Sequence, residues 1–299
     1  MTSKPLHLRL PATSANLGPG FDALGLAMGL YLTIDAAPSE AFQITATGRN
    51  ANLCAALEDN LILDTYTDVL AAVGRSGPAL SLKISNEIPL GMGCGSSAAA
   101  LLAGVLLANH FGGLQWTLQR ILQEACRREG HPDNVAACYL GGMTVSTVSK
   151  GEVITAACGE NLTWNLLLAL PTASLATEKA RALLPSTYSR GDAVANIQAT
   201  ALLVAAFAQG RGDLLRTAMQ DRIHQPYRME ACPLLPLLLP LAGQPGILGV
   251  ALSGAGPSVL LIADNAIPAP ILFATIRQAA GDPSLEVIQT TISTGILQR

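Results

Sequence analysis

Residues 89–100 read Pro89-Leu90-Gly91-Met92-Gly93-Cys94-Gly95-Ser96-Ser97-Ala98-Ala99-Ala100 and lead directly into an alanine- and leucine-rich run. Glycine adopts left-handed backbone conformations without steric cost, so three alternating glycines can form a tight loop whose amides face a ligand. We expect Ser96 or Ser97 to cap the following helix, and the unpaired N–H groups at a helix start attract anions. The segment therefore predicts a loop that wraps phosphate.

Two familiar phosphate loops are excluded by the spacing. A Walker A loop requires a lysine after its last glycine, and none follows Gly95. In a dinucleotide-binding fingerprint the third glycine would come one residue later. The helix dipole contributes only about 0.3–1 kcal/mol per exposed charge, so a triphosphate would need several amides and a metal ion. A glycine-rich turn that only caps a buried helix stays open as an alternative.

The composition predicts a globular protein with a sizeable core. Of 299 residues, 50% are hydrophobic and 13% are charged, and the formal net charge is -3. Since there is no basic run, the sequence argues against nucleic acid or an anionic membrane surface as a partner. The alternation of Leu6, Leu8 and Leu10 favours a strand over a signal segment, and no uninterrupted apolar run reaches about 18 residues. We expect a cytoplasmic protein.

Cysteine and histidine usage argues against a zinc site. The six cysteines form no C-x-x-C pair and are expected to be reduced and buried. Cys126, His131 and Cys138 are near one another in sequence, but their spacing differs from the short spacings of zinc sites.

Hydrophobic periodicity predicts mixed helices and strands without strict alternation, which favours an α+β fold over a doubly wound sheet. A polar, glycine-containing loop is expected over 11–22. Domain boundaries are expected to give an N-terminal domain over 1–160 and a C-terminal domain over 161–299. Helices are expected over 61–73 with Asn60 as cap, 97–110, 116–128, 178–184, 193–208, 214–224 and 269–280. Strands are expected over 6–10, 80–84, 143–148, 153–156, 164–170, 246–252, 258–263 and 285–290.

Four segments together resemble the GHMP kinases. They are PATSANLGPGFDALGLA at 11–27, PLGMGCGSSAAA at 89–100, EGHPDNVAACYLGG at 129–142 and LSGAGPSV at 252–259. The first and third are similar to those of the homoserine kinases within that superfamily. The similarity spans nearly the whole chain, in the order and spacing of the family. It implies a fold of two α+β domains with the active site in the cleft between them.

The resemblance implies ATP and Mg²⁺ as cofactors. In this family the second segment, from Pro89 to Ala99, holds the ATP phosphates through backbone amides. A serine hydroxyl, here Ser97 with Ser96 beside it, would hold Mg²⁺ together with a helix carboxylate. The family glutamate lies about eight residues before the histidine of the third segment, where this chain has Gln123, and so its neighbour Glu124 is predicted as the metal ligand. The alternative for Glu124 is a solvated helix residue.

The resemblance also implies an amino-acid site. It assigns Asn16, Asp22, His131 and Asn134 to the homoserine site, and the first two could instead cap the turn in which they lie. Many relatives have a catalytic aspartate in the third segment, and homoserine kinases are thought to have asparagine at its position. Asp133 next to Asn134 leaves both chemistries open.

A carboxylate substrate requires cations. Thr177 and Arg181 are four residues apart, hence on one helical face, and match the carboxylate site of the family. Arg228 matches the second family arginine, and a guanidinium can hold a carboxylate with two hydrogen bonds. The segment 252–259 is expected to bring backbone beside the cleft.

The implied activity is transfer of the γ-phosphate of ATP to the side-chain hydroxyl of L-homoserine, a step toward threonine. Two alternatives stay open: a GHMP kinase for another small alcohol, and a non-catalytic nucleotide-binding protein. The sequence does not decide the oligomeric state, although many relatives are dimers and a homodimer is compatible with it.

Overall fold

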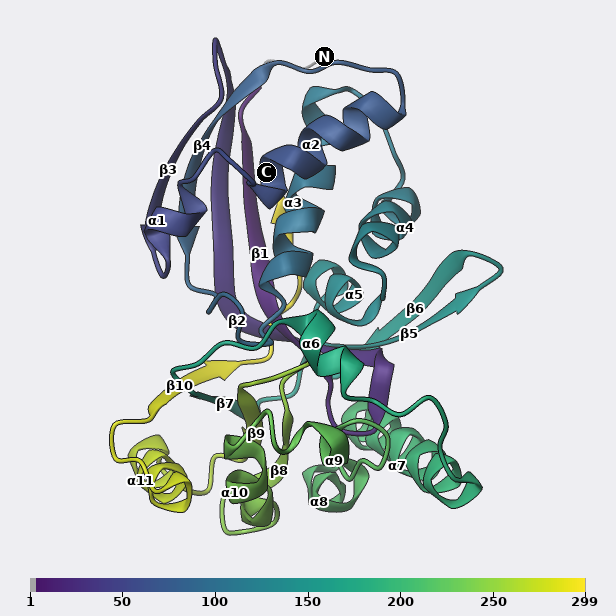
Figure 1. Cartoon of the computed structure of the whole chain (residues 1–299), viewed down its shortest axis with the longest axis vertical. Coiled ribbons are helices and arrows are strands. Elements are labelled where there is room, and N and C mark those ends of the chain that lie inside the picture. Colours follow the sequence, from purple (N-terminus) through teal and green to yellow (C-terminus); the bar gives the residue numbers. More distant parts are fainter. Residues whose placement is uncertain (1–3, 299) are drawn as a thin grey trace.

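The computed structural model describes residues 4–298, in which a seven-stranded sheet and a four-stranded sheet lie one above the other (Figure 1). The centre of the larger sheet is the long strand β2 (Gly20–Ser39), which is antiparallel to three others. These are β1 (Leu6–Asn16), β4 (Ala79–Asn86) and β5 (Met143–Ser149). The sheet is completed by β3 (Gln43–Gly48), parallel to β4, by β6 (Glu152–Cys158), and by β11 (Leu297–Gln298) beside β1.

Helices cover one face of the larger sheet (Figure 1). They are α2 (Leu61–Ala72), α3 (Ser96–Phe111), α4 (Leu118–Glu129) and α5 (Asp133–Leu140), and a short α1 (Ala51–Cys54) follows β3. The α3 helix is apolar on nearly all sides because it packs between the sheet and α2, α4 and α5. Its first residue directly follows the glycine loop, so the core fixes where that loop points.

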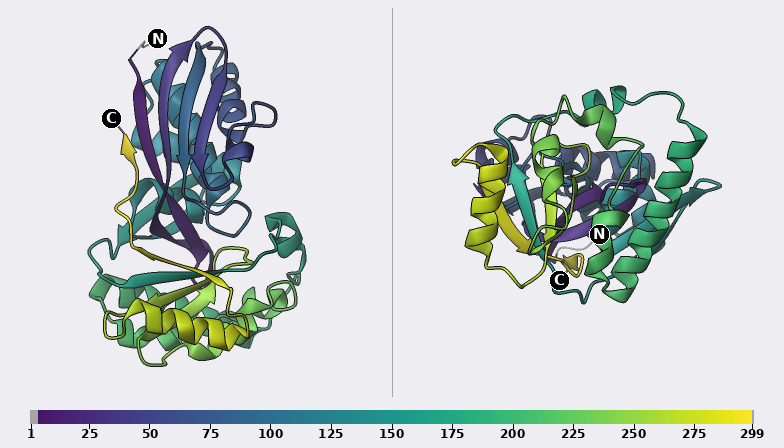
Figure 2. Two further views of the ribbon diagram at one scale, coloured as in Figure 1. Left: turned by 90° about the vertical axis from the view of Figure 1, so that its left-hand side faces the viewer. Right: turned by 90° about the horizontal axis from the view of Figure 1, so that it is seen from below.

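The smaller sheet is antiparallel in the order β10-β7-β9-β8. Its strands are β7 (Asn165–Leu170), β8 (Ile247–Leu252), β9 (Val259–Ala263) and β10 (Glu286–Thr291). The helices are α6 (Thr177–Ala182), α7 (Arg190–Gln209), α8 (Leu215–Ala218), α9 (Gln225–Arg228), α10 (Leu234–Leu238) and α11 (Ala269–Ala280), with 3-10 turns at Gly212–Leu214 and Leu239–Leu241. Helices α8, α10 and α11 lie on the side away from the larger sheet, whereas α6 lies between the two layers (Figure 1 and Figure 2).

Two features bear on the expected organisation. By length and composition α7 could cross a membrane, but Leu203, Ala206 and Phe207 on one of its faces are buried in the protein. After β10 the chain returns to the larger sheet, where β11 pairs with β1. The division at residue 160 stays a prediction.

The loop expected over 11–22 is wrong, because β1 continues to Asn16 and β2 begins at Gly20. Two register shifts against β2, after Pro11 and after Ala15, let a proline enter the strand. The polar side chains of Thr13, Ser14 and Asn16 in this stretch are buried and hydrogen-bonded, which the sequence pattern alone could not reveal.

Other expected elements are confirmed or corrected. Asn60 caps α2 through its side-chain oxygen, as predicted. The predicted serine cap of α3 is wrong, because Gly95 in the left-handed region is the N-cap residue and no side chain caps it. The helix expected over 214–224 ends at Ala218, and the chain then turns before α9. Neither β3 nor α5 was predicted.

A close approach between α2 and α3 gives a stability prediction. A Cβ added to Gly104 would lie 2.7 Å from the carbonyl oxygen of Ile62, so Gly104→Ala must move one helix. We expect it to lower the free energy of unfolding by about 1–2 kcal/mol, although alanine is the better helix former by about 1 kcal/mol. In the matched control, Gly191→Ala in α7, the added atom meets only Ser189 Oγ at 3.7 Å, and stability should be unchanged or slightly raised. Urea unfolding of both variants checks this, and equal stabilisation by both would refute the contact argument.

Candidate active site

A cavity of about 330 Å³ brings the four sequence segments together. On one side it is bounded by residues of the larger sheet and its helices. On the other side it is bounded by α6 and the residues just before it, by α9, and by the loop that follows β8. The predicted residues that line it are Asn16, Asp22, Gly91, Gly93, Cys94, Gly95, Ser96, Ser97, His131, Asp133, Asn134, Thr177, Arg181 and Arg228. Phe21, Glu129, Leu175, Gly254 and Ala255 also line it.

The glycine loop is held by the first and fourth segments. Gly91, Gly93 and Gly95 all have φ near +70°, a region in which other residues are strained. Thr13 donates its backbone N–H to Cys94 O at 3.0 Å, and Ser253 Oγ lies 2.8 Å from Gly93 O. A Cβ at Gly93 would overlap Ser253 O, so glycine is required for this approach between the two sheets. The loop is therefore preorganised.

Asp22 and Arg181 form a two-pronged ion pair across the cavity. Both nitrogen–oxygen distances are 2.8 Å, and about a third of the Asp22 side chain is exposed. Asn16 instead ties the turn together, since its Oδ1 accepts from Asp22 N and its Nδ2 donates to Gly254 O. Of the two residues considered for turn capping, only Asn16 makes such contacts.

The third segment places a histidine and a carboxylate in contact at the start of α5. His131 Nδ1 lies 2.6 Å from Asp133 Oδ1, which also accepts from Asn134 N. Burial alone would lower the pKa of His131, but its hydrogen bond to Asp133 and the charges of Asp133, Glu129 and Asp22 outweigh burial and raise that pKa. Asn134 Oδ1 accepts a hydrogen bond from Thr13 Oγ1 at 2.7 Å, so it faces the glycine loop.

The acidic residue beside Ser97 is Glu129, which the sequence reasoning missed. Ser97 Oγ donates to Glu129 Oε2 at 2.9 Å, and burial raises the pKa of Glu129 although this hydrogen bond opposes the rise. Glu124 does not line the cavity, because it is buried one turn earlier in α4 and accepts hydrogen bonds from Arg127 and Arg128 at 2.8 Å. Burial acts to raise the pKa of Glu124, but these hydrogen bonds and charges lower it.

Beside the glycine loop lies a second, more apolar pocket of about 290 Å³. Its apolar lining includes Leu53, Leu61, Ile62, Ile88 and Leu90, and it shares Ser96 and Ser97 with the cavity. Pro89, Met92, Ala98 and Ala99, also predicted to bind the cofactor, line neither space.

Comparison with known proteins identifies the family. The GHMP kinases N terminal domain matches residues 60–142, and the GHMP kinases C terminal domain matches residues 203–280. Homoserine kinase from Solibacter usitatus is 51% identical over 256 residues, which cover 85% of this chain and 84% of that protein. Homoserine kinase from Synechocystis sp. is 41% identical over 281 residues, 93% of this chain and 92% of that one.

Solved structures agree with this assignment. The crystal structure of homoserine kinase from Cytophaga hutchinsonii has a TM-score of 0.82 and 25% identity, covering 100% of this chain and 99% of that one. Mevalonate diphosphate decarboxylase from Enterococcus faecalis, at 13% identity and a TM-score of 0.67 over 99% of this chain and 98% of its own, shares the fold. The α+β class and the resemblance predicted from the sequence are confirmed. The chain belongs to the homoserine kinase family of the GHMP kinases, which are ATP-dependent kinases.

Proposed function

We propose that this protein transfers the γ-phosphate of ATP to the side-chain hydroxyl of L-homoserine, giving O-phospho-L-homoserine. The observation that carries the proposal is the content of the cavity of about 330 Å³. The glycine loop at the start of α3, a carboxylate and two guanidinium groups meet there, so an anion, an ammonium group and a carboxylate each find a counterpart. A zwitterionic amino acid beside a polyphosphate matches this arrangement.

The amino-acid end would be held by Asp22, Thr177, Arg181 and Arg228. In the structure Asp22 and Arg181 neutralise each other, and a bound zwitterion would exchange this contact for its own ammonium and carboxylate. Arg228 is buried except at the cavity, where desolvation strengthens a bond to a carboxylate. Asn16 would support the site by fixing the turn that carries Asp22.

The nucleotide would extend from the apolar pocket to the cavity. The apolar lining suits an adenine ring, and the shared Ser96 and Ser97 lie where its phosphates would reach the glycine loop. Backbone N–H groups of Gly91 to Ser97 are proposed to bind the phosphates.

The donor set beside the loop fits Mg²⁺. Ser97 and Glu129 offer a hydroxyl and a carboxylate oxygen 2.9 Å apart, and oxygen ligands of this kind suit magnesium. When bound there, Mg²⁺ supplies positive charge to the phosphates. We propose Glu129, and not Glu124, as the carboxylate.

The protein groups would act mainly by positioning. Phosphoryl transfer proceeds through a loose transition state, so alignment and charge neutralisation count for more than proton abstraction. Correct juxtaposition of two bound reactants contributes about 7–11 kcal/mol. Asp133 and Asn134 both line the cavity, Asp133 close to Asp22 and Asn134 close to Gly95, and either could face the substrate hydroxyl. We also propose that the enzyme is soluble and cytoplasmic.

The test is release of ADP with Mg²⁺, ATP and a panel of alcohols. We expect the highest kcat/KM with L-homoserine, far above those with mevalonate or shikimate. A higher kcat/KM for another alcohol would assign the protein to a different GHMP kinase activity. Nucleotide binding without product from any alcohol would favour a non-catalytic protein.

A further inference from the structure

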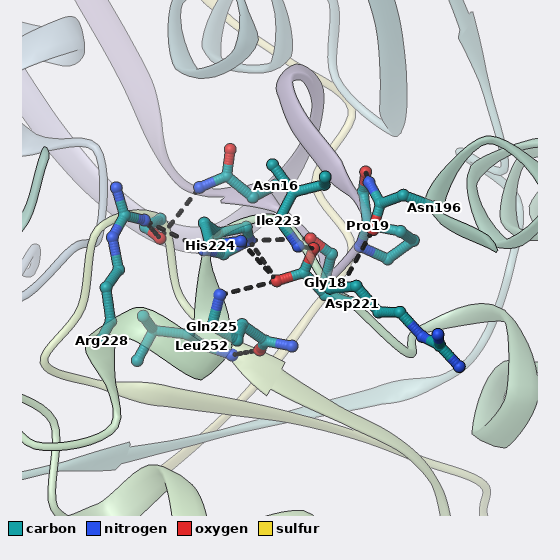
Figure 3. A network of polar contacts seen from close by, with 12 residues as sticks. Asn16, Gly18, Pro19, Asn196, Asp221, Ile223, His224, Gln225, Arg228 and Leu252 are labelled. Carbon is teal, nitrogen blue, oxygen red and sulfur yellow. Dashed lines mark hydrogen bonds and ion pairs between the residues drawn. The ribbon is translucent and has the colours of Figure 1, made fainter. Parts of the chain in front are cut away.

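Behind the cavity wall, the buried side chains of Asp221, His224, Gln225 and Arg228 form a polar network (Figure 3). Asp221, whose side chain is fully buried, accepts hydrogen bonds from three consecutive backbone N–H groups. These belong to Ile223 at 2.9 Å, His224 at 3.0 Å and Gln225 at 2.6 Å. The backbone that carries His224 is therefore held rigidly at the start of α9.

The hydrogen bonds of His224 determine its tautomer. Its Nδ1 lies 3.0 Å from Arg228 Nη1, and since a guanidinium can only donate, Nδ1 must accept. The ring proton is then on Nε2, which donates to Gly18 O at 2.8 Å. Burial lowers the pKa of His224, and the charge of Arg228 acts in the same direction although Asp221 opposes it. The ring is thus neutral, and both its nitrogens are used.

Arg228 is restrained on one side and open on the other. Its Nε donates to Ala180 O at 3.2 Å, and its Nη1 is directed at His224, with Gly254 O at 3.4 Å. Within residues 4–298 Nη2 has no hydrogen-bond partner. It is not among the fully buried unpaired atoms, and Arg228 lines the cavity, so Nη2 is accessible there. Phe21, whose ring centre is 5.5 Å from the guanidinium carbon, packs against it.

We propose that His224 is a positioning residue for the substrate carboxylate. Its neutral ring connects the turn of the first segment, through Gly18, to Arg228 and holds the guanidinium so that Nη2 stays directed at the cavity. His224 does not line the cavity, so we propose that it acts through Arg228 and not by contact with the substrate. This inference rests on the proposed function, because it assumes that the ligand of Arg228 is the carboxylate of homoserine.

Two substitutions separate the two bonds of the ring. Asparagine places its side-chain oxygen near the position of Nδ1, so His224→Asn keeps an acceptor for Arg228 and loses the bond to Gly18. Glutamine places its side-chain nitrogen near the position of Nε2, so His224→Gln keeps the bond to Gly18 and loses the acceptor. We expect His224→Gln to raise the KM for homoserine about tenfold, with kcat and the KM for ATP nearly unchanged. His224→Asn should stay within about threefold of the unmodified enzyme.

A double-mutant cycle provides the control. In an Arg228→Met background, His224→Gln should leave the homoserine KM unchanged, because the group that it positions is gone. Three results would overturn the inference. They are equal effects of His224→Asn and His224→Gln on the homoserine KM, an equal effect of His224→Gln with and without Arg228, and a loss confined to kcat.

The crystal structure of the His224→Gln variant is a second measurement. A rotated guanidinium supports the inference, and an unmoved one with an unchanged KM contradicts it. Absence of homoserine phosphorylation by the unmodified enzyme would instead refute the proposed function.

Discussion

Glu129→Gln is expected to lower kcat/KM for homoserine about a thousandfold, because the substitution removes the negatively charged carboxylate that we propose as a Mg²⁺ ligand beside Ser97. Glutamine has nearly the same shape and can still accept from the Ser97 hydroxyl, so the loss should come from metal binding and charge. A Mg²⁺ titration of the initial rate should show a higher half-saturating concentration. Since burial raises the pKa of Glu129, its charge is costly in the fold, and the variant should be no less stable than the parent.

Glu124→Gln is the matched control, five residues earlier on the same helix. It weakens hydrogen bonds from Arg127 and Arg128 and should cost about 1–2 kcal/mol of stability while leaving the Mg²⁺ dependence unchanged. The two variants are therefore expected to show opposite patterns. Glu129→Gln should lose activity and keep its stability, whereas Glu124→Gln should lose stability and keep its activity. If Glu129→Gln and the parent show the same Mg²⁺ dependence, Glu129 is not a metal ligand. If Glu124→Gln changes the Mg²⁺ dependence, the metal ligand is Glu124, as predicted from the sequence.

This contrast also shows what sequence reasoning could reach at the site. The four segments identified the family and contained most of the cavity-lining residues, because the residues of a functional motif lie close together in the folded protein. The carboxylate ligand of Mg²⁺ was predicted from its distance in sequence to His131, and this pointed to Glu124. Glu129, the first residue of the same segment as His131, was not considered. Which of two acidic residues on α4 faces Ser97 depends on where the helix ends and how it packs on α3, and only the fold determines that.

The strand β1 illustrates a similar limit for the fold. Pro11, Ser14 and Asn16 are typical of loops, yet they lie in or at the end of a buried strand together with Thr13. Their polar atoms are satisfied by residues more than a hundred positions away, such as Asn134 and Ser253. Local propensity is overridden here because the strand carries the site. Apolar elements such as α3 and β9, whose stability depends on burial, were predicted well.

Asp22→Asn is expected to lower kcat/KM for homoserine about a hundredfold, through loss of the partner for the substrate ammonium. The substitution is clean, because Asp22 has a φ of +55°, and asparagine tolerates the left-handed region as well as aspartate does. Its backbone bond to Asn16 does not involve the side chain that changes. The variant therefore removes charge without disturbing the turn, and the KM for ATP should be unchanged.

A substrate that lacks the amino group isolates this role. With 4-hydroxybutanoate the variant should lose nothing, and it could gain, since Arg181 is freed from its ion pair with Asp22 and becomes available to the carboxylate. Asp192→Asn is the control, because Asp192 also pairs with an arginine and has a side-chain exposure of 36%, against 34% for Asp22, but lies outside the cavity. If Asp22→Asn lowers kcat/KM equally for both substrates, Asp22 serves only to hold Arg181, and recognition of the amino group must be assigned to another residue.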